Sequence, residues 1–302
     1  MQKIVLSGLI NIETAVAVDE FPIEYTPVDY KFFGINTTVS GVAYNVAKAL
    51  KTLGTDVELL SITADDIFSS AINSELEALD ISTAYLEDLL TETPQSVILY
   101  DQEGKRRINL DLKNIQELTY PVEKVKDVIK KADIVVATNI NFSREIMRAA
   151  KRQNKVIASD VHVISDIHDD FNQEFMQLAD ILFFSNEAIL NKEEAFLRKV
   201  IKHYDNEIIV VGMGAKGSLL YTKEEQKIRR VEAVETREII NTTGAGDALF
   251  SAFLHFYGKG KSAYKALKLA TIFASYKIGA SGGAKGFLDE KSLIELAQRV
   301  YS

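Results

Sequence analysis

Short apolar runs alternate with longer amphipathic segments along most of this chain, and this alternation restricts the fold more than any other feature. Six runs have the length and composition of buried strands: residues 3–6, 57–61, 134–137, 155–158, 181–184 and 207–211. The segments between them have helical periodicity: residues 42–53, 67–79, 122–131, 143–153 and 188–204. Strands that alternate with helices form βαβ units, which build a parallel sheet covered on both faces. The sequence therefore predicts an α/β fold with a mainly parallel central sheet flanked by helices.

Two regions interrupt the alternation and predict a small β-rich flap beside this sheet. Residues 11–38 contain no convincing helix and are rich in β-forming residues, prolines and aromatic residues. Residues 96–110 predict two strands around the turn at 101–104. We expect a single domain over residues 1–302, with a lid subdomain from about 11–38 and 96–111. A dimer contact or a plain surface hairpin would explain the same pattern, and the dense aromatic residues favour a buried face on the flap.

Composition excludes several classes of function. The chain has no cysteine, which rules out disulfides, a thiol nucleophile and a thiolate metal site. Its four histidines lack the spacing of zinc ligands. The net charge is −8 and the densest basic patch, residues 105–107, is too short to follow a phosphate backbone, so we expect no nucleic-acid partner. No segment predicts a signal peptide or a membrane span, and we expect a cytoplasmic protein without a membrane partner.

Residues 241–248, Asn-Thr-Thr-Gly-Ala-Gly-Asp-Ala, form the most informative motif. The apolar residues that follow have the spacing of an amphipathic helix: Leu249, Ala252, Phe253 and Phe256. Glycines at a helix N-terminus bring free backbone amides close to a ligand, and the helix dipole favours an anion there. Asp247 lies in the first turn, which suits phosphoryl transfer: an oxyanion cradle beside a carboxylate that can receive a hydroxyl proton. A glycine-rich loop with Asp247 as a helix stabiliser would explain the same spacing.

The predicted position of Asp247 limits its strength as a base. An unperturbed Asp has a pKa of about 3.9, and a helix N-terminus stabilises the anion by about 0.3–1 kcal/mol. This lowers the pKa by less than about one unit. We therefore expect Asp247 to orient a hydroxyl and to accept its proton late, which a loose transition state permits.

Residues 212–217 match the pattern G-x-G-x-x-G after a predicted strand, which is typical of dinucleotide-binding folds. That fingerprint requires a helix next, whereas residues 218–222 predict another strand. Ser218 also stands where a Walker A loop has its lysine. We interpret the segment as a strand–turn–strand whose turn can line a nucleotide pocket. A nicotinamide-dependent oxidoreductase is therefore disfavoured.

A second glycine site opens the helix predicted at residues 42–53. The buried stripe of this helix consists of Val42, Val46, Leu50 and Leu53. Asn45 lies off the stripe, and its amide offers both a donor and an acceptor, which suits vicinal hydroxyls. Gly41 allows a close approach of the backbone. A helix start with an incidental polar residue would explain the same pattern.

Taken together, these sites resemble the ribokinase-like (PfkB) family of carbohydrate and nucleoside kinases, and the resemblance spans essentially the whole chain. Residues 243–247 match the C-terminal signature of that family, and Gly41 with Asn45 matches its N-terminal glycine–asparagine motif. Residues 214–217 look like its nucleotide-side turn, and residues 101–106 resemble its lid hairpin. The resemblance implies an ATP-dependent kinase that phosphorylates a primary hydroxyl of a ribose-like sugar. A nucleoside kinase of the pseudouridine or adenosine type, or a catalytically impaired sugar or nucleotide sensor, are the alternatives.

The resemblance also implies roles for individual residues. Asp247 is the implied catalytic base, and the implied anion hole consists of Gly244, Ala245 and Gly246. The implied substrate-binding residues are Asn11, Glu13, Gly41, Asn45 and Asp247. The implied ATP-binding residues are Asn186, Gly214, Gly217, Thr243, Gly244 and Gly246. Family members commonly need Mg²⁺ and many are activated by K⁺, and we expect a homodimer through the lid.

Four positions depart from the family pattern. Asn241 replaces an Asp at the head of the signature, and Ser40 replaces the first of two paired glycines, which would narrow the substrate pocket. Glu13 follows Asn11 where a sugar-binding Asp is common, and would reach further by one methylene. In the metal-organising Asn-x-x-Glu motif that starts at Asn186, Ile189 stands at the glutamate position. The substitutes for that glutamate are Glu187, our candidate metal residue, and Glu193.

Overall fold

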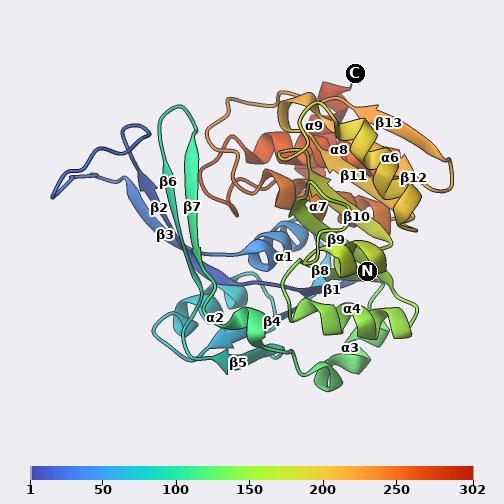
Figure 1. The fold of residues 1–302 in the computed structure, drawn as a ribbon, viewed down its shortest axis with the longest axis horizontal. Coiled ribbons are helices and arrows are strands. Elements are labelled where there is room, and N and C mark those ends of the chain that lie inside the picture. The colour runs from blue at the N-terminus through green and yellow to red at the C-terminus, as the bar shows by residue number, and fades with distance from the viewer. Residues whose placement is uncertain (1, 302) are drawn as a thin grey trace.

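The computed structural model describes residues 2–301, which form a large central sheet with helices on both faces (Figure 1). The order of strands in the sheet is β13-β12-β11-β10-β9-β8-β1-β4-β5. Their bounds are β1 (Lys3–Ser7), β4 (Asp56–Ala64), β5 (Leu86–Leu90), β8 (Ile134–Ala137), β9 (Val156–Val163), β10 (Ile181–Ser185), β11 (Ile208–Gly212), β12 (Ser218–Thr222) and β13 (Lys227–Val231). All pairs from β5 to β11 are parallel, and β12 and β13 are antiparallel. The predicted α/β fold is confirmed.

Helices cover both faces of this sheet. One face carries α1 (Val42–Thr52), α2 (Ser69–Ala78), α7 (Ala245–Gly258), α8 (Ala263–Lys277) and α9 (Glu290–Val300). The other carries α3 (Lys126–Lys131), α4 (Ser143–Arg152), α5 (Gln173–Leu178) and α6 (Glu193–His203). Each strand contributes side chains to both cores, because successive side chains of a strand point to opposite faces of the sheet. In β1, Ile4 and Leu6 pack toward α7 and α8, whereas Val5 packs into the opposite core. Within residues 2–301, no helix is long and apolar enough to span a membrane.

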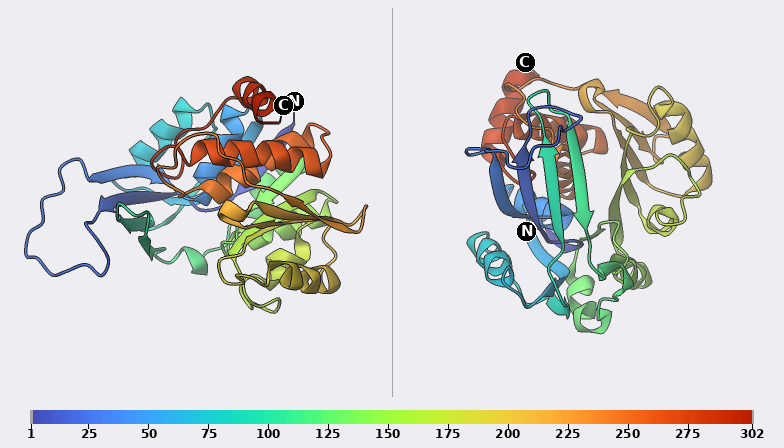
Figure 2. Two further views of the ribbon diagram at one scale, coloured as in Figure 1. Left: turned by 90° about the horizontal axis from the view of Figure 1, so that it is seen from above. Right: turned by 60° about the vertical axis from the view of Figure 1, so that its left-hand side comes forward.

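A second, smaller sheet stands beside the body, as the sequence predicts. Its order is β3-β2-β6-β7, with bounds β2 (Asn11–Ala17), β3 (Ile35–Ser40), β6 (Gln95–Tyr100) and β7 (Arg106–Asp111). The loop 18–34 extends from this sheet away from the body (Figure 2, left). Its aromatic residues are exposed in the single chain, Tyr25 by 91% and Phe33 by 101%, so a buried face on the flap would need a ligand or a partner chain and stays a prediction.

The boundaries of three predicted helices differ from the structure. The helix predicted at 188–204 starts at Glu193, because Asn191 has a left-handed backbone (φ 62) that an α-helix cannot include. The segment 122–131 divides into a 3-10 turn, η2 (Val122–Val125), followed by α3. Helix α2 is shorter than predicted by about a residue or two at each end. The strand predicted after Gly217 is present as β12, which excludes the dinucleotide fingerprint.

Candidate active site

The N-terminus of α7 has the geometry of an anion site. Gly244 caps the helix in the left-handed region (φ 75), and no side chain caps it. A Cβ on Gly244 would lie 2.3 Å from the carbonyl oxygen of Gly283, so only glycine fits. The amide of Ala245 donates to the carbonyl of Thr242 at 3.2 Å, within the turn. The amide of Gly246, one residue further on, belongs to the first turn, where amides have no acceptor within the helix.

The asparagine at the head of the signature keeps a structural role. The side-chain oxygen of Asn241 accepts a hydrogen bond from the amide of Thr243 at 2.7 Å. This bond closes a short turn of the kind that Asn and Asp both form. The replacement of Asp by Asn therefore removes a charge from the loop and preserves its local conformation.

Asp247 and Asn45 meet although they are 202 positions apart in the sequence. Asn45 Nδ2 donates to Asp247 Oδ2 at 2.8 Å. Asn45 is only 6% exposed, and its Oδ1 has no hydrogen-bond partner within the described residues. A buried acceptor without a partner costs free energy, so this atom favours a ligand that carries a hydroxyl. The pair therefore combines a carboxylate with a free acceptor, as binding and deprotonating a polyol requires.

The environment of Asp247 raises its pKa, contrary to the sequence-based expectation. Burial of the carboxylate is the main cause, and the negative charge of Asp160 adds to it. His162, the hydrogen bond from Asn45 and the charge of Lys277 act in the opposite direction. The helix terminus favours the anion by a fraction of one pKa unit, whereas loss of hydration can shift a pKa by several units. Asp247 is thus a stronger base than an exposed Asp.

Glu13 and Asn11 project from β2 beside the second sheet. Glu13 is 9% exposed and accepts a hydrogen bond from Ser40 Oγ at 3.1 Å. Burial raises the pKa of Glu13, against the opposing effects of that bond and of nearby cationic side chains. Asn11 Nδ2 donates to Ser96 Oγ at 3.0 Å, and its buried Oδ1 has no partner within residues 2–301. Ser40 was expected to narrow the substrate pocket; its hydroxyl donates a hydrogen bond that holds the Glu13 carboxylate in place.

Gly41 serves the packing of the chain itself. It precedes α1 with φ 102, and a Cβ there would lie 2.4 Å from the carbonyl oxygen of Leu9. No other residue could bring the start of α1 so close to the segment between β1 and β2. Gly41 places Asn45 one turn further along the helix, so its effect on the site is indirect.

The second sheet reaches the signature loop through one arginine. Arg106, the first residue of β7, donates from Nη1 to Thr243 Oγ1 at 3.0 Å. This contact places an exposed guanidinium beside the anion site, which the lid interpretation requires. Thr243, predicted to bind the nucleotide, is thus held by the second sheet on one side.

The residues predicted on the nucleotide side lie at the carboxyl ends of β10 and β11. The amide of Asn186 donates to the carbonyl of Gly212 at 2.9 Å, which ties this residue to the glycine turn. Gly214 has φ 55 and open space around it, so ligand access there is free. Gly217 has φ 82, and a Cβ would lie 2.1 Å from the carbonyl oxygen of Val231, so it packs against the chain itself.

Glu193, and not Glu187, is the carboxylate that meets Asn186. Asn186 Nδ2 donates to Glu193 Oε1 at 2.8 Å, whereas the Glu187 side chain is exposed and Ile189 is buried. Among residues 2–301, no group of three or more His, Asp or Glu side chains could hold a metal. Such a cluster is not required for Mg²⁺, which is usually bound by one or two carboxylates, substrate phosphates and water.

Four residues around the signature loop and Asp247 have roles that the sequence patterns do not reveal. Asp160 lies close to Gly246, whose Cβ would be 4.0 Å from Asp160 Oδ2. His162 adopts a left-handed backbone (φ 58), and its amide donates to Asp160 Oδ1. Arg106 was noticed as part of the hairpin, without a role in the site. The fourth is Lys277, which ends a helix, where basic residues are so common that the sequence carries no signal.

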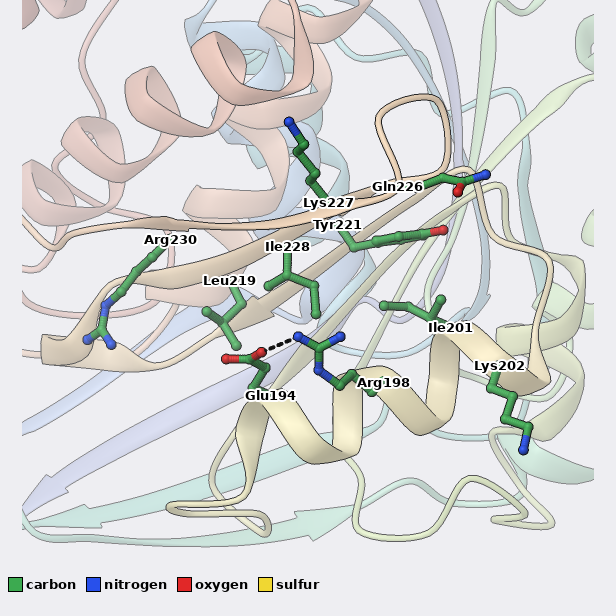
Figure 3. Close-up of a pocket in the computed structure, with 10 residues that line it drawn as sticks. All are labelled: Glu194, Arg198, Ile201, Lys202, Leu219, Tyr221, Gln226, Lys227, Ile228 and Arg230. Carbon is green, nitrogen blue, oxygen red and sulfur yellow. Dashed lines mark hydrogen bonds and ion pairs between the residues drawn. The ribbon is translucent and has the colours of Figure 1, made fainter.

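A cavity of about 710 Å³ lies away from this site, between α6 and strands β12 and β13 (Figure 3). Its lining contains none of the predicted site residues. Arg198 on α6 forms an ion pair with Glu194 inside it. The lining carries the basic side chains of Arg198, Lys202, Lys227 and Arg230, the acidic side chain of Glu194, and apolar groups such as Leu219.

Comparison with known proteins agrees with this geometry. Residues 1–290 match the model of the pfkB family of carbohydrate kinases, and the chain belongs to this family. It is therefore a phosphotransferase of the sugar and nucleoside kinase class, as the sequence predicts. A nucleoside kinase of Methanocaldococcus jannaschii is 28% identical over 308 residues, which cover 93% of this chain and 92% of that protein.

Solved structures show the same fold over the whole chain. A microbiome-derived acarbose kinase has a TM-score of 0.89 at 22% identity and covers 99% of each chain. A ribokinase of Arabidopsis thaliana complexed with ribose and ATP has a TM-score of 0.82 at 19% identity and covers 98% of this chain and 99% of its own.

Proposed function

We propose that this protein transfers the γ-phosphoryl group of ATP to a primary hydroxyl of a ribose-like sugar. The observation that carries the proposal is the contact between Asn45 and Asp247 beside the uncapped N-terminus of α7. The unpartnered Oδ1 of Asn45 would accept a hydrogen bond from one sugar hydroxyl, and Asp247 would accept one from the attacking hydroxyl. The amides at the start of α7 would stabilise the transferred phosphoryl group.

In the transfer step, the sugar oxygen forms a bond to the γ-phosphorus while the bond between that phosphorus and the β,γ-bridging oxygen breaks. The proton of the hydroxyl passes to a carboxylate oxygen of Asp247, and ADP leaves with the bridging oxygen. The raised pKa of Asp247 makes its carboxylate better matched to this proton than an exposed Asp would be. Most of the rate must still come from positioning and charge stabilisation.

For the nucleotide, the proposal assigns Gly214 and Asn186 to the ATP side of the site. Mg²⁺ would be organised by Asn186 and Glu193 and would neutralise phosphate charge when bound. Glu193→Gln should raise the Mg²⁺ concentration needed for half-maximal turnover, and Glu187→Gln is the matched control because that side chain is exposed. Equal effects of the two changes would contradict the assignment of Glu193.

A nucleoside kinase is the second candidate, and two observations favour it. The Methanocaldococcus jannaschii relative is a nucleoside kinase. The loop 18–34 also exposes Tyr25, Tyr30, Phe32 and Phe33, which could stack on a nucleobase when the lid is closed. A catalytically impaired sensor would not need Asp247 and Asn45 aligned on one acceptor site, so it is the weaker alternative.

We also propose that the second sheet contributes to a homodimer. Its strand β7 is exposed along its whole length and carries Ile108 and Leu110, which are 51% and 55% exposed. Replacing both with Ser should abolish a dimer measured by sedimentation without altering the fold. A wild-type chain that sediments as a monomer at every concentration would contradict this proposal.

The substrate is best determined by an ATP-consumption screen over pentoses, hexoses and nucleosides, with and without K⁺. We expect turnover with a pentose that carries a free primary hydroxyl, and no turnover with the same sugar lacking that hydroxyl. Asp247→Asn is the negative control for contaminating kinases. Turnover restricted to nucleosides would select the second candidate, and phosphorylation that persists in Asp247→Asn would refute the assignment of the base.

A further inference from the structure

Lys277, the last residue of α8, is completely buried, which is rare for a lysine. Its Nζ donates to the backbone carbonyl of Thr243 and to that of Gly282, the latter at 2.7 Å. Asp247 and Glu13 attract it electrostatically, but within the part of the chain that the structure describes neither hydrogen-bonds to it. Lys277 is thus a cation held in a cradle of carbonyl groups, without a direct counter-ion.

This cradle lies where two loops of the active site touch. Thr243 immediately precedes Gly244, the residue that caps α7, and Gly282 immediately precedes Gly283. Gly244 and Gly283 are packed so closely that a Cβ on Gly244 would lie 2.3 Å from the Gly283 oxygen. The ammonium group therefore ties the signature loop to the loop after α8, directly behind the anion site.

The charges around Lys277 come from four other elements or loops. Asp247 on α7 and Glu13 on β2 favour its charged form, whereas Arg106 on β7 and Arg237 in the loop before α7 disfavour it. Burial is the largest effect and lowers the pKa of Lys277 to about 8. A charge in such a position costs several kcal/mol of hydration, so its retention calls for a function.

The residues of this cradle do not fit a K⁺ ion. Backbone carbonyl groups are the ligands that K⁺ uses in selective protein sites. Here the carbonyls of Thr243 and Gly282 already accept hydrogen bonds from Lys277, which also supplies the positive charge. A K⁺ ion in the same place would meet the ammonium group at short range, and like charges repel strongly where water is excluded.

We propose that Lys277 is a positioning residue that acts as a tethered monovalent cation, and that this kinase therefore does not require K⁺. The inference depends on the proposed kinase function, since the loop that Lys277 holds is the one assigned to phosphate. Its role is indirect: it fixes Thr243 and so the orientation of the amides at the start of α7.

The first test compares KCl with choline chloride at a constant ionic strength of about 0.15 M, which keeps general screening equal. Two quantities are measured: turnover with the acceptor from the substrate screen, and the midpoint of thermal unfolding. For the wild-type protein, neither should depend on which salt is present. Activation of the wild type by K⁺, or a K⁺-specific rise in its unfolding midpoint, would overturn the proposal.

The second test removes the tethered cation. Lys277→Ala leaves the two carbonyls free, so K⁺ should now raise turnover by about tenfold, within the usual range of coupling between two sites. K⁺ should also raise the unfolding midpoint of this variant, and Lys277→Arg should keep part of the activity without K⁺. Lys265→Ala is the matched control, since Lys265 lies on the same helix and is exposed.

The outcomes separate this inference from the proposed function. A Lys277→Ala variant that is fully active in choline, or inactive and insensitive to K⁺ while folded, overturns the role of Lys277. If the variant does not fold in either salt, the comparison of KCl with choline chloride on the wild-type protein decides whether the proposal stands. If the wild type phosphorylates no acceptor, the proposed function fails, and the unfolding midpoints in the two salts still judge whether Lys277 fills a cation site.

Discussion

Replacement of Asn45 by Ala tests the centre of the proposed site, because the proposal gives Asn45 a role toward both the base and the substrate. In the folded protein Asn45 Nδ2 donates to Asp247 Oδ2 at 2.8 Å, and Oδ1 is buried without a partner in the described chain. The substitution removes the donor from the carboxylate and the acceptor from the substrate. It leaves the helix intact, since Ala is the best helix former.

The expected shift in the pKa of Asp247 follows from the kind of hydrogen bond that is lost. A hydrogen bond to a charged group contributes about 1.5–3 kcal/mol, and one pKa unit corresponds to about 1.4 kcal/mol. The pKa of Asp247, already raised by burial, should therefore rise by about one to two further units in Asn45→Ala. Only the ionised carboxylate can accept the proton, so activity at low pH should be lost first.

The assay is the pH dependence of kcat/KM, whose acidic limb reports the free enzyme. We expect this limb to move to higher pH by about one to two units, with a higher KM for the sugar at every pH. Unfolding in denaturant gives an independent readout. A folded-state pKa above the unfolded value costs stability as pH rises through that range, so the variant should be destabilised more at pH 7 than at pH 4.

Asn11→Ala is the matched control. Asn11 is also a buried amide on the substrate side, but its donor goes to Ser96 and not to Asp247. This variant should raise KM and leave the acidic limb where it is. If Asn45→Ala raises KM without moving the limb, the hydrogen bond does not set the pKa of the base, and our account of Asp247 is wrong.

Four further predictions concern single residues. Asp247→Asn should lower turnover by about 10²–10⁴-fold. Its free energy of unfolding at pH 7, measured in denaturant, should stay equal or rise, because a carboxylate with a raised pKa destabilises the folded state at that pH. Gly244→Ala should lower stability by at least about 1–2 kcal/mol and weaken ATP binding, since its φ is 75 and its Cβ would strike Gly283; unchanged calorimetric binding would count against the anion site. Arg106→Ala should weaken nucleotide binding but change the unfolding free energy by less than about 1 kcal/mol, because its side chain is exposed at the start of β7. Turnover should decline as pH rises through about 8, where Lys277 loses its proton. The free energy of unfolding should not fall over the same range, because the unfolded chain, with an ordinary lysine pKa, holds that proton to higher pH. Parallel loss of activity and folded structure would contradict this reasoning.

The parts of the fold that follow from local patterns were predictable. Residues 134–137 were predicted as a strand and form β8 with the same bounds, because a short apolar run between helical segments has few other solutions. The helix predicted at 188–204 began five residues too early. Its first residues include Asn191, whose left-handed backbone is set by the turn around it. Hydrophobic periodicity does not reveal such a backbone conformation.

The site residues also divide into those that local sequence patterns reveal and those that depend on the tertiary structure. Gly244 and Asp247 were identifiable because an anion cradle needs glycine beside a helix start, and these residues are neighbours in the sequence. The family resemblance implied that Asp247 and Asn45 belong to one substrate site, but their hydrogen bond was not predicted. The bond from Ser40 to Glu13 was not foreseen, and the sequence left Glu187 and Glu193 as alternatives beside Asn186, because each contact depends on side-chain directions that packing decides.

From its sequence alone, this protein can be assigned an alternating α/β body, a β-rich flap and a glycine-rich helix start, since each depends on residues that are adjacent or periodic. The protonation chemistry is a property of the folded molecule. The sequence predicts a lowered pKa for Asp247, and burial raises it; a lysine at the end of α8 is an ordinary residue until folding buries it against Thr243 and Gly282. Hydration and Coulomb energies depend on distances through space, and folding brings Lys277 to Thr243 across 34 positions and Asn45 to Asp247 across 202.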